Sequence, residues 1–301
     1  MNRRAFVLSM MAIVLSWGLN YVVTKVGVHF VPPLLFVFWR FVLTAAFLLY
    51  WMRRQMPRTF TVWGQVALLG WVGISGYQWL FATALHKAPA ATVAFLFDLS
   101  PVLTLILQRI SGGRPLSRAA LGGMLLAFTG VGFLVGGAAM GLSSGDIYAV
   151  AAALAWAVFT VLTDRFHVPL GGMALTGWMA LFGSLALLPF VWSTPWGGLQ
   201  DFSMGSSAAL GYTVILVTIM GLSLWQTAVV AAGAASASVY LYLIPIVAAA
   251  AGWVFLDEAM DIWQFIGALG ILLGVMTAEG FWTMMGNQRK KMKQAHRTES
   301  L

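Results

Sequence analysis

Cysteine is absent from the 301 residues, and charged residues make up only 9% of them. Without cysteine the chain forms no disulfide and offers no thiolate to a metal ion or to nucleophilic catalysis. Soluble domains carry about 25% charged residues. So small a share, together with 60% hydrophobic residues and a mean hydropathy of +0.87, excludes a water-soluble fold.

Long apolar runs recur along the chain at the length of a transmembrane helix, which is about 20 residues for a hydrocarbon core of ~30 Å. The run after Arg3 and Arg4 is too long for the apolar part of a cleaved signal peptide, so we interpret it as the first span. Pro89 and the stretch 233–235 separate spans that follow each other closely. The sequence therefore predicts an all-α polytopic membrane protein with ten transmembrane helices, at approximately residues 5–28, 34–52, 62–85, 90–110, 118–138, 146–165, 172–193, 208–232, 235–256 and 262–284.

Lysine and arginine are distributed unequally between the two sides that these spans define. Fourteen of the 17 basic residues fall on the side of the N-terminus, Lys25 and Lys87 fall on the other side, and Arg40 lies inside the second span. Because positive residues mark the cytoplasmic side, we expect a bacterial-type inner-membrane protein with both termini in the cytoplasm. We interpret the basic cytoplasmic tail, 287–301, as a segment that contacts the lipid surface and not nucleic acid.

The two halves of the chain resemble each other at an offset of 144 residues, which aligns Pro101 with Pro245 and Gly130 with Gly274. We therefore expect a first five-helix repeat at 1–141 and a second at 142–286. Because five is odd, the repeats enter the membrane in opposite senses. Such inverted repeats hold a binding site near the midplane between them.

Pro101 and Pro245 fall in the middle of spans four and nine, where each removes a backbone hydrogen bond. Paired interruptions at equivalent positions indicate a transport site, so we predict that both prolines are hinges. The alternative is that they are ordinary prolines of membrane helices, tolerated because neighbouring groups satisfy the backbone.

Short motifs follow one another along the chain: Trp17-Gly18 with Asn20, Arg40-Phe41, Ala84-Leu85 followed by Ala88 to Ala91, Pro101, Gly145-Asp146, Ala155-Trp156-Ala157, Ala231 to Ser238, Pro245, and Asp257-Glu258 before Gly267 and Gly274. In this order and spacing they resemble the drug/metabolite transporter superfamily, in its ten-helix branch with two EamA repeats. Arg114 departs from the pattern, because the first repeat commonly has an acidic residue there.

This resemblance implies an exporter of small metabolites, in which spans 1 to 4 and 6 to 9 surround a central cavity and spans 5 and 10 are peripheral. The narrower resemblance is to the YddG-like amino-acid exporters. The 14 Trp and 20 Phe suit aromatic substrates, although membrane proteins also use aromatic residues at the bilayer interfaces.

Asp98 and Arg40 are the charged residues inside predicted spans that most need an explanation. A carboxylate at mid-bilayer costs at least about 2.5–3.5 kcal/mol, so Asp98 should face protein or a water-filled cavity. It is a candidate to bind a substrate ammonium or a proton, and Arg40 to bind a substrate carboxylate. The two residues lie at similar depths, so a buried structural pair is the alternative.

Other polar and aromatic residues inside the spans are candidates to line the cavity, or alternatively to pack and bond between helices. Asn20 forms a stripe at helical spacing with aromatic residues one turn away. Tyr242 occupies the position in the second repeat that Asp98 occupies in the first. The predicted substrate-binding residues are Asp98, Arg40, Asn20, Trp17, Tyr21, Tyr77, Gln78, Trp156, Tyr240 and Tyr242.

The sequence favours a transporter that exports amino acids by alternating access. It has no P-loop for direct use of ATP, so we expect a secondary transporter. Uniport and proton coupling both stay open. The alternatives are an exporter of cationic drugs with the same fold, a channel, and a membrane-embedded lipid or prenyl transferase. We expect no enzyme activity, cofactor or metal, since the only acidic cluster, Asp257, Glu258 and Asp261, falls in an outer connector. The expected partners are a small-molecule substrate and the bilayer, and the sequence gives no oligomeric state.

Overall fold

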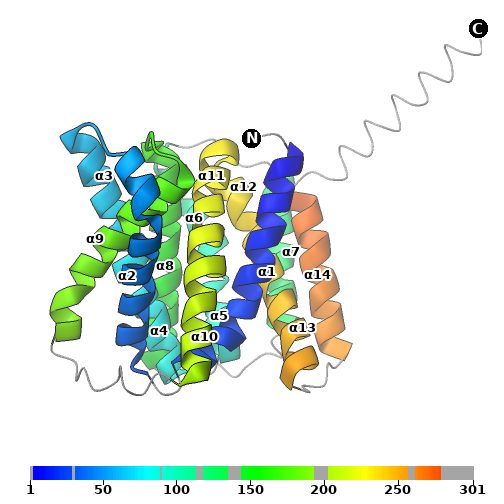
Figure 1. The fold of residues 1–301 in the computed structure, drawn as a ribbon. Coiled ribbons are helices and arrows are strands. Elements are labelled where there is room, and N and C mark those ends of the chain that lie inside the picture. The colour runs from blue at the N-terminus through cyan, green and yellow to red at the C-terminus, as the bar shows by residue number, and fades with distance from the viewer. Residues whose placement is uncertain are drawn as a thin grey trace, which may run out of the picture.

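The computed structural model of the chain describes residues 3–28, 31–88, 90–112, 118–134, 144–192, 203–256 and 262–278. Every regular element in these ranges is a helix (Figure 1). In the first half they are α1 (Arg3–Gly27), α2 (Pro33–Arg54), α3 (Phe60–Gly70), η1 (Trp71–Gly76), α4 (Tyr77–Lys87), α5 (Ala90–Phe97), α6 (Ser100–Ile110) and α7 (Arg118–Leu134). In the second half they are α8 (Ser144–Phe166), α9 (Gly172–Trp192), α10 (Met204–Tyr212), η3 (Thr213–Leu222), α11 (Ser223–Ala232), α12 (Ala234–Val239), η4 (Tyr240–Leu243), α13 (Ile244–Leu256) and α14 (Ile262–Ala278).

Many of these helices are long and apolar enough to cross a bilayer. Among the described residues, six helical stretches are at least 18 residues long and have a high mean hydropathy, and three further apolar helices are shorter. Large apolar side chains point outward along the bundle, for example Leu8 at 70% and Phe47 at 61% exposure. An apolar exterior of this extent suits lipid and not water. The chain is a helical membrane protein that crosses the bilayer several times.

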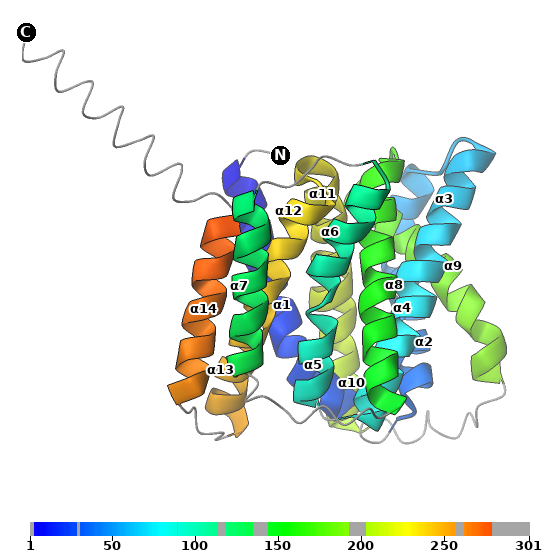
Figure 2. The ribbon, with the colours of Figure 1, turned by 180° about the vertical axis from the view of Figure 1, so that it is seen from behind.

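The first and last described helices reach the same end of the bundle. α1 begins, and α14 ends, at the upper end in Figure 1, and the view from behind agrees (Figure 2). The proposed cytoplasmic tail, 287–301, and the acidic cluster near residue 258 lie outside the described residues.

The two repeat-related prolines each begin a helix directly after an interruption. Asp98 and Leu99 separate α5 from α6, and Pro101 occupies the first turn of α6. In the second half the 3₁₀ turn η4 precedes α13, which has Pro245 as its second residue. Proline is well suited to a first helical turn, because the N–H it lacks has no intrahelical partner there. The interruptions therefore follow from the sequence at both positions.

The third helical stretch of each half contains one π-helical segment. η1 joins α3 to α4 without a gap, and η3 joins α10 to α11 in the same way. The π-helix is rare and is found frequently at functional sites. Gly73 permits close packing at η1, because a Cβ there would overlap the ring of Phe159 on α8.

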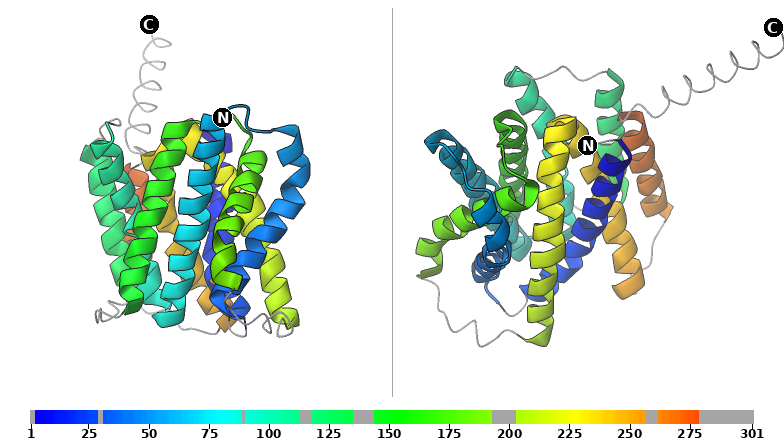
Figure 3. Two further views of the ribbon diagram at one scale, coloured as in Figure 1. Left: turned by 90° about the vertical axis from the view of Figure 1, so that its left-hand side faces the viewer. Right: turned by 45° about the horizontal axis from the view of Figure 1, so that its top comes forward.

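α7 and α14 lie side by side at one edge of the bundle (Figures 2 and 3). A Cβ on Gly130 would lie 2.7 Å from the carbonyl oxygen of Gly267, and one on Gly274 would lie 2.5 Å from the carbonyl oxygen of Gly123. The two contacts are equivalent in the internal repeat, because the offset of 144 residues relates Gly130 to Gly274 and Gly123 to Gly267. They also pair a rising residue number on α7 with a falling number on α14, so the helices are antiparallel.

Gly233 separates α11 from α12, as the sequence predicts. Its φ is +90°, a backbone conformation that residues other than glycine rarely adopt. Its N–H donates to the Val229 carbonyl at the end of α11. Pro89, the other predicted separator, lies outside the described residues.

Candidate functional site

A small cavity lies between the helices of the two halves. Residues of α1, α2, α4, α5, α8, α13 and the two π-helical segments contribute to its wall. Seven of the ten predicted substrate-binding residues are among its lining residues, which are Trp17, Asn20, Tyr21, Arg40, Phe41, Gly73, Tyr77, Gln78, Phe81, Phe97, Trp156, Val217, Leu222 and Ile244.

The cavity is narrow in this conformation. Its volume of about 50 Å³ is room for roughly three or four water molecules. Ligand pockets for small molecules usually measure ~300–1,000 Å³. Any solute of amino-acid size therefore requires the surrounding helices to move apart.

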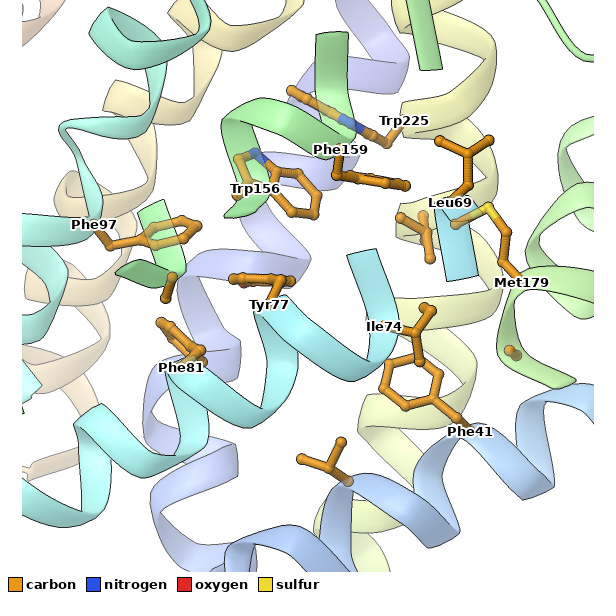
Figure 4. Close-up of a cluster of buried hydrophobic side chains, with 14 of the residues drawn as sticks. Phe41, Leu69, Ile74, Tyr77, Phe81, Phe97, Trp156, Phe159, Met179 and Trp225 are labelled. Carbon is orange, nitrogen blue, oxygen red and sulfur yellow. The ribbon is translucent and has the colours of Figure 1, made fainter. Parts of the chain in front are cut away.

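Three tryptophans from three helices close one side of this region. Trp156 of α8 lies 5.3 Å from Trp17 of α1 and 5.3 Å from Trp225 of α11, measured between ring centroids. Trp17 and Trp225 are 5.6 Å apart. Offset and edge-on aromatic pairs at such distances attract each other beyond their area of contact. Figure 4 shows Trp156 with Trp225 beyond it.

Tyr77 carries the aromatic surface from Trp156 toward α5 (Figure 4). Its ring lies 4.9 Å from that of Trp156 and stacks on Phe97 at 5.5 Å. Phe81, one turn further along α4, contacts both Tyr77 and Tyr21 of α1. The cavity is therefore bounded by flat, polarizable side chains.

The π-helical segment η3 accepts a hydrogen bond from the first helix. Trp17 Nε1 donates to the carbonyl oxygen of Val217 at 3.1 Å. Gly221 allows this approach, because a Cβ there would overlap the indole nitrogen of Trp17. The irregular backbone of η3 thus faces the cavity and fixes the position of an aromatic wall residue.

Arg40 is the charged side chain in the cavity wall. It is 5% exposed, and its Nε donates to Thr218 Oγ1 at 2.7 Å. The Thr218 hydroxyl in turn donates to the Thr213 carbonyl, five residues earlier in the π-helical region. Among the described residues the two terminal amino groups of Arg40 have no hydrogen-bond or ion-pair partner. The guanidinium is thus anchored at one nitrogen and presents two others.

Trp17, Asn20, Tyr21 and Gln78 are the partly exposed members of the wall. Asn20 accepts a hydrogen bond from Thr24 Oγ1 at 2.9 Å through its Oδ1. Its amide nitrogen has no hydrogen-bond partner in the described part of the chain, so the wall offers a neutral donor in addition to Arg40.

Asp98, Tyr240 and Tyr242 do not line the cavity. Phe97, the last residue of α5, contributes to the lining, and Asp98, which follows it in the interruption, does not. Tyr240 packs against Phe6 of α1, and Tyr242 is fully buried among residues of α7 and α14. No ion pair joins Asp98 to Arg40 in the described part of the chain, so the structural pair considered above is not formed in this conformation.

Sequence reasoning did not single out seven of the lining residues: Phe41, Gly73, Phe81, Phe97, Val217, Leu222 and Ile244. In a chain this apolar, a Phe or Leu that faces the cavity looks like one that faces lipid. It also missed Thr218, the anchor of Arg40, because the two residues are 178 positions apart. No described group of three His, Cys, Asp or Glu side chains lies close enough together to hold a metal ion.

The sequence profile of the EamA-like transporter family matches this chain twice, over residues 4–136 and 143–278. The chain belongs to this family. One matched segment lies in each half of the chain. The bilayer crossings described above are therefore those of a membrane transporter, and drug/metabolite transporters are its superfamily.

Relatives of this EamA-like transporter include one named as a transporter and one named as an efflux pump. An uncharacterized transporter of Archaeoglobus fulgidus is 26% identical over 272 residues, which is 87% of this chain and 92% of the relative. A probable amino-acid metabolite efflux pump of Salmonella typhimurium is 28% identical over 293 residues, 91% and 94% of the two chains. A crystal structure with 21% identity matches the fold at a TM-score of 0.77 over 94% of this chain and 99% of that one.

Proposed function

We propose that this EamA-like transporter exports small amphipathic molecules that carry a carboxylate, with amino acids bearing aromatic or large apolar side chains as the preferred class. The observation that carries this proposal is the position of Arg40 in the wall of an aromatic cavity, with two amino groups that have no hydrogen-bond partner among the described residues. A planar guanidinium binds both oxygens of a carboxylate. The surrounding Trp, Tyr and Phe rings offer a surface for the apolar part of the same molecule.

The charge of the wall also discriminates between the candidate substrates. Arg40 faces the cavity, and Asp98 does not contribute to its lining. A cationic drug would meet an uncompensated positive charge there, which disfavours it relative to an anionic or zwitterionic solute. The name of the Salmonella relative, an amino-acid metabolite efflux pump, agrees with the proposed class.

We further propose ten spans in two inverted five-helix repeats, with both termini in the cytoplasm and the protein in the inner membrane. The antiparallel contact of Gly130 with Gly267, repeated by Gly274 with Gly123, supports the inverted arrangement. The paired helix interruptions and the paired π-helical segments support it as well. Rocking of one repeat against the other would widen the narrow cavity and open it to each side in turn.

The test is counterflow of each of the twenty amino acids into proteoliposomes that contain the purified protein. We expect saturable exchange of phenylalanine and similar amino acids. Arg40→Gln removes at least one charge-assisted hydrogen bond of about 1.5–3 kcal/mol, so KM should rise by on the order of 10- to 100-fold or more.

Arg54→Gln is the matched control, because Arg54 lies at the end of the same helix, stacks on Tyr50 and is remote from the cavity. Its KM should stay at the wild-type value. An unchanged KM in Arg40→Gln, or efficient transport of cations that lack a carboxylate, would show that the proposed binding mode is wrong.

A further inference from the structure

Four buried side chains at or next to the two helix interruptions each have a polar atom with no hydrogen-bond partner among the described residues. Asp98 is 3% exposed and its Oδ2 is unpaired, and the hydroxyls of Ser100, Ser238 and Tyr242 are also buried and unpaired. Asp98 and Ser100 belong to the first half of the chain, and Ser238 and Tyr242 belong to the second. The two halves meet here, because α6 packs against α12 and η4 follows α12 directly. Buried polar groups in native proteins are nearly always paired, so an unpaired carboxyl oxygen at Asp98 needs an explanation.

At each interruption a backbone carbonyl also loses the N–H that would donate to it in a regular helix. In a regular helix residue 101 would donate to the carbonyl of Phe97, and residue 245 to that of Leu241. Pro101 and Pro245 have no N–H to donate. Asp98 therefore directly follows a residue whose carbonyl lacks its regular helical donor, as in the half-helix arrangement that secondary transporters use for coupling ions.

No positive charge compensates Asp98 within the described residues. The titratable groups in electrostatic range of it are Tyr21 of α1 and Tyr242 of η4, both neutral hydroxyls. Tyr77 of α4 interacts with Arg40 instead. On α8, Asp164 and Arg165 lie at the far end of the helix, where Gln108 donates to Asp164 and Arg165 donates to the carbonyl of Ser111. α12 contains no titratable side chain.

We propose that Asp98 is the proton-binding group of this transporter, separate from the substrate cavity, and that it is a neutral carboxylic acid in the conformation described here. An isolated carboxylate in this dry setting is strongly unfavourable, so the helices close around Asp98 only after a water-borne proton has formed an O–H bond with it. When the repeats rock and the site opens to the other side, the proton returns to water. Tyr242 replaces the carboxyl group at the equivalent position, so one proton moves per cycle.

The protonation state is testable without any substrate. Infrared spectra of the purified protein in lipid at neutral pH should contain the C=O stretching band of a buried protonated carboxyl group. Asp98→Asn should remove that band, and Asp164→Asn should leave it, because Asp164 is partly exposed and accepts a hydrogen bond from Gln108. A band that persists in Asp98→Asn overturns the proposal.

Coupling itself rests on the proposed export function and is tested in proteoliposomes with tritiated phenylalanine. A pH gradient should drive accumulation in the wild type and in Asp98→Glu. Asp98→Asn should lose at least 10-fold of that accumulation but keep counterflow, which needs no net proton movement. Loss of counterflow as well, or accumulation driven by a sodium gradient and not by pH, overturns the proposal.

The two experiments fail in different ways. If the wild type does not move phenylalanine, the proposed substrate class is wrong, and the infrared band alone then decides whether Asp98 binds a proton. If phenylalanine is moved but the band is absent from the wild type, the export function stands and the proton site does not.

Discussion

Gly130 lies where α7 crosses α14, and one added methyl group there should destabilise the protein. A Cβ on Gly130 would lie 2.7 Å from the carbonyl oxygen of Gly267, 2.7 Å from the nitrogen of Ile271 and 3.0 Å from the carbonyl carbon of Gly270. All three are backbone atoms, so no side chain can rotate away. Forced overpacking of this kind costs about 1–3 kcal/mol, which corresponds to a fall of roughly 2–10 °C in melting temperature for Gly130→Ala.

Gly122→Ala on the same helix is the control, because a Cβ at Gly122 meets nothing within 4 Å. Alanine is better than glycine in a helix by about 0.5–1 kcal/mol, so this variant should be unchanged or slightly stabilised. Thermal unfolding of both proteins in the same detergent, followed by circular dichroism, compares them directly. Equal melting temperatures would refute the close crossing and, with it, the antiparallel contact that supports the inverted repeats.

Two further variants test the site and the interruptions. Thr218→Val keeps the side-chain shape but removes the acceptor for Arg40 Nε. The KM for phenylalanine should therefore rise about 10-fold or more, with a smaller change in kcat. A KM equal to that of the wild type would mean that Thr218 does not position the guanidinium. Pro245→Ala restores a backbone donor at the second interruption, so the transport rate should fall while the Kd from tryptophan fluorescence stays constant. Pro189→Ala, inside the uninterrupted helix α9, is its control, and equal rates in the two variants would contradict a hinge at Pro245.

The positions of the helices could be predicted from the sequence because hydrophobic run length determines them. The predicted span 34–52 corresponds to α2 at Pro33–Arg54, and 172–193 to α9 at Gly172–Trp192. The prolines and Gly233 also indicated where helices stop, since each acts through its own backbone chemistry. The π-helical segments η1 and η3 had no such signal, because their winding depends on packing with neighbouring helices.

The site could be predicted only where polarity distinguishes a residue from its apolar surroundings. Asn20, Arg40 and Gln78 stood out for this reason and do line the cavity. Asp98 stood out equally, yet it is absent from the cavity lining, to which the preceding Phe97 contributes. Depth in the membrane can be counted along a sequence, but the direction of a side chain next to an interruption cannot.

The measurement that tests the carrier mechanism most directly is two-sided labelling of Asn20→Cys. The chain has no cysteine of its own, so the introduced thiol is the only reactive one, and position 20 is a partly exposed part of the cavity wall. An impermeant maleimide reacts irreversibly, so it also traps a conformation that is rarely populated. We predict labelling from both faces, in right-side-out and inside-out vesicles, and protection by phenylalanine in each. Labelling from one face only, with and without phenylalanine, would contradict alternating access at this cavity.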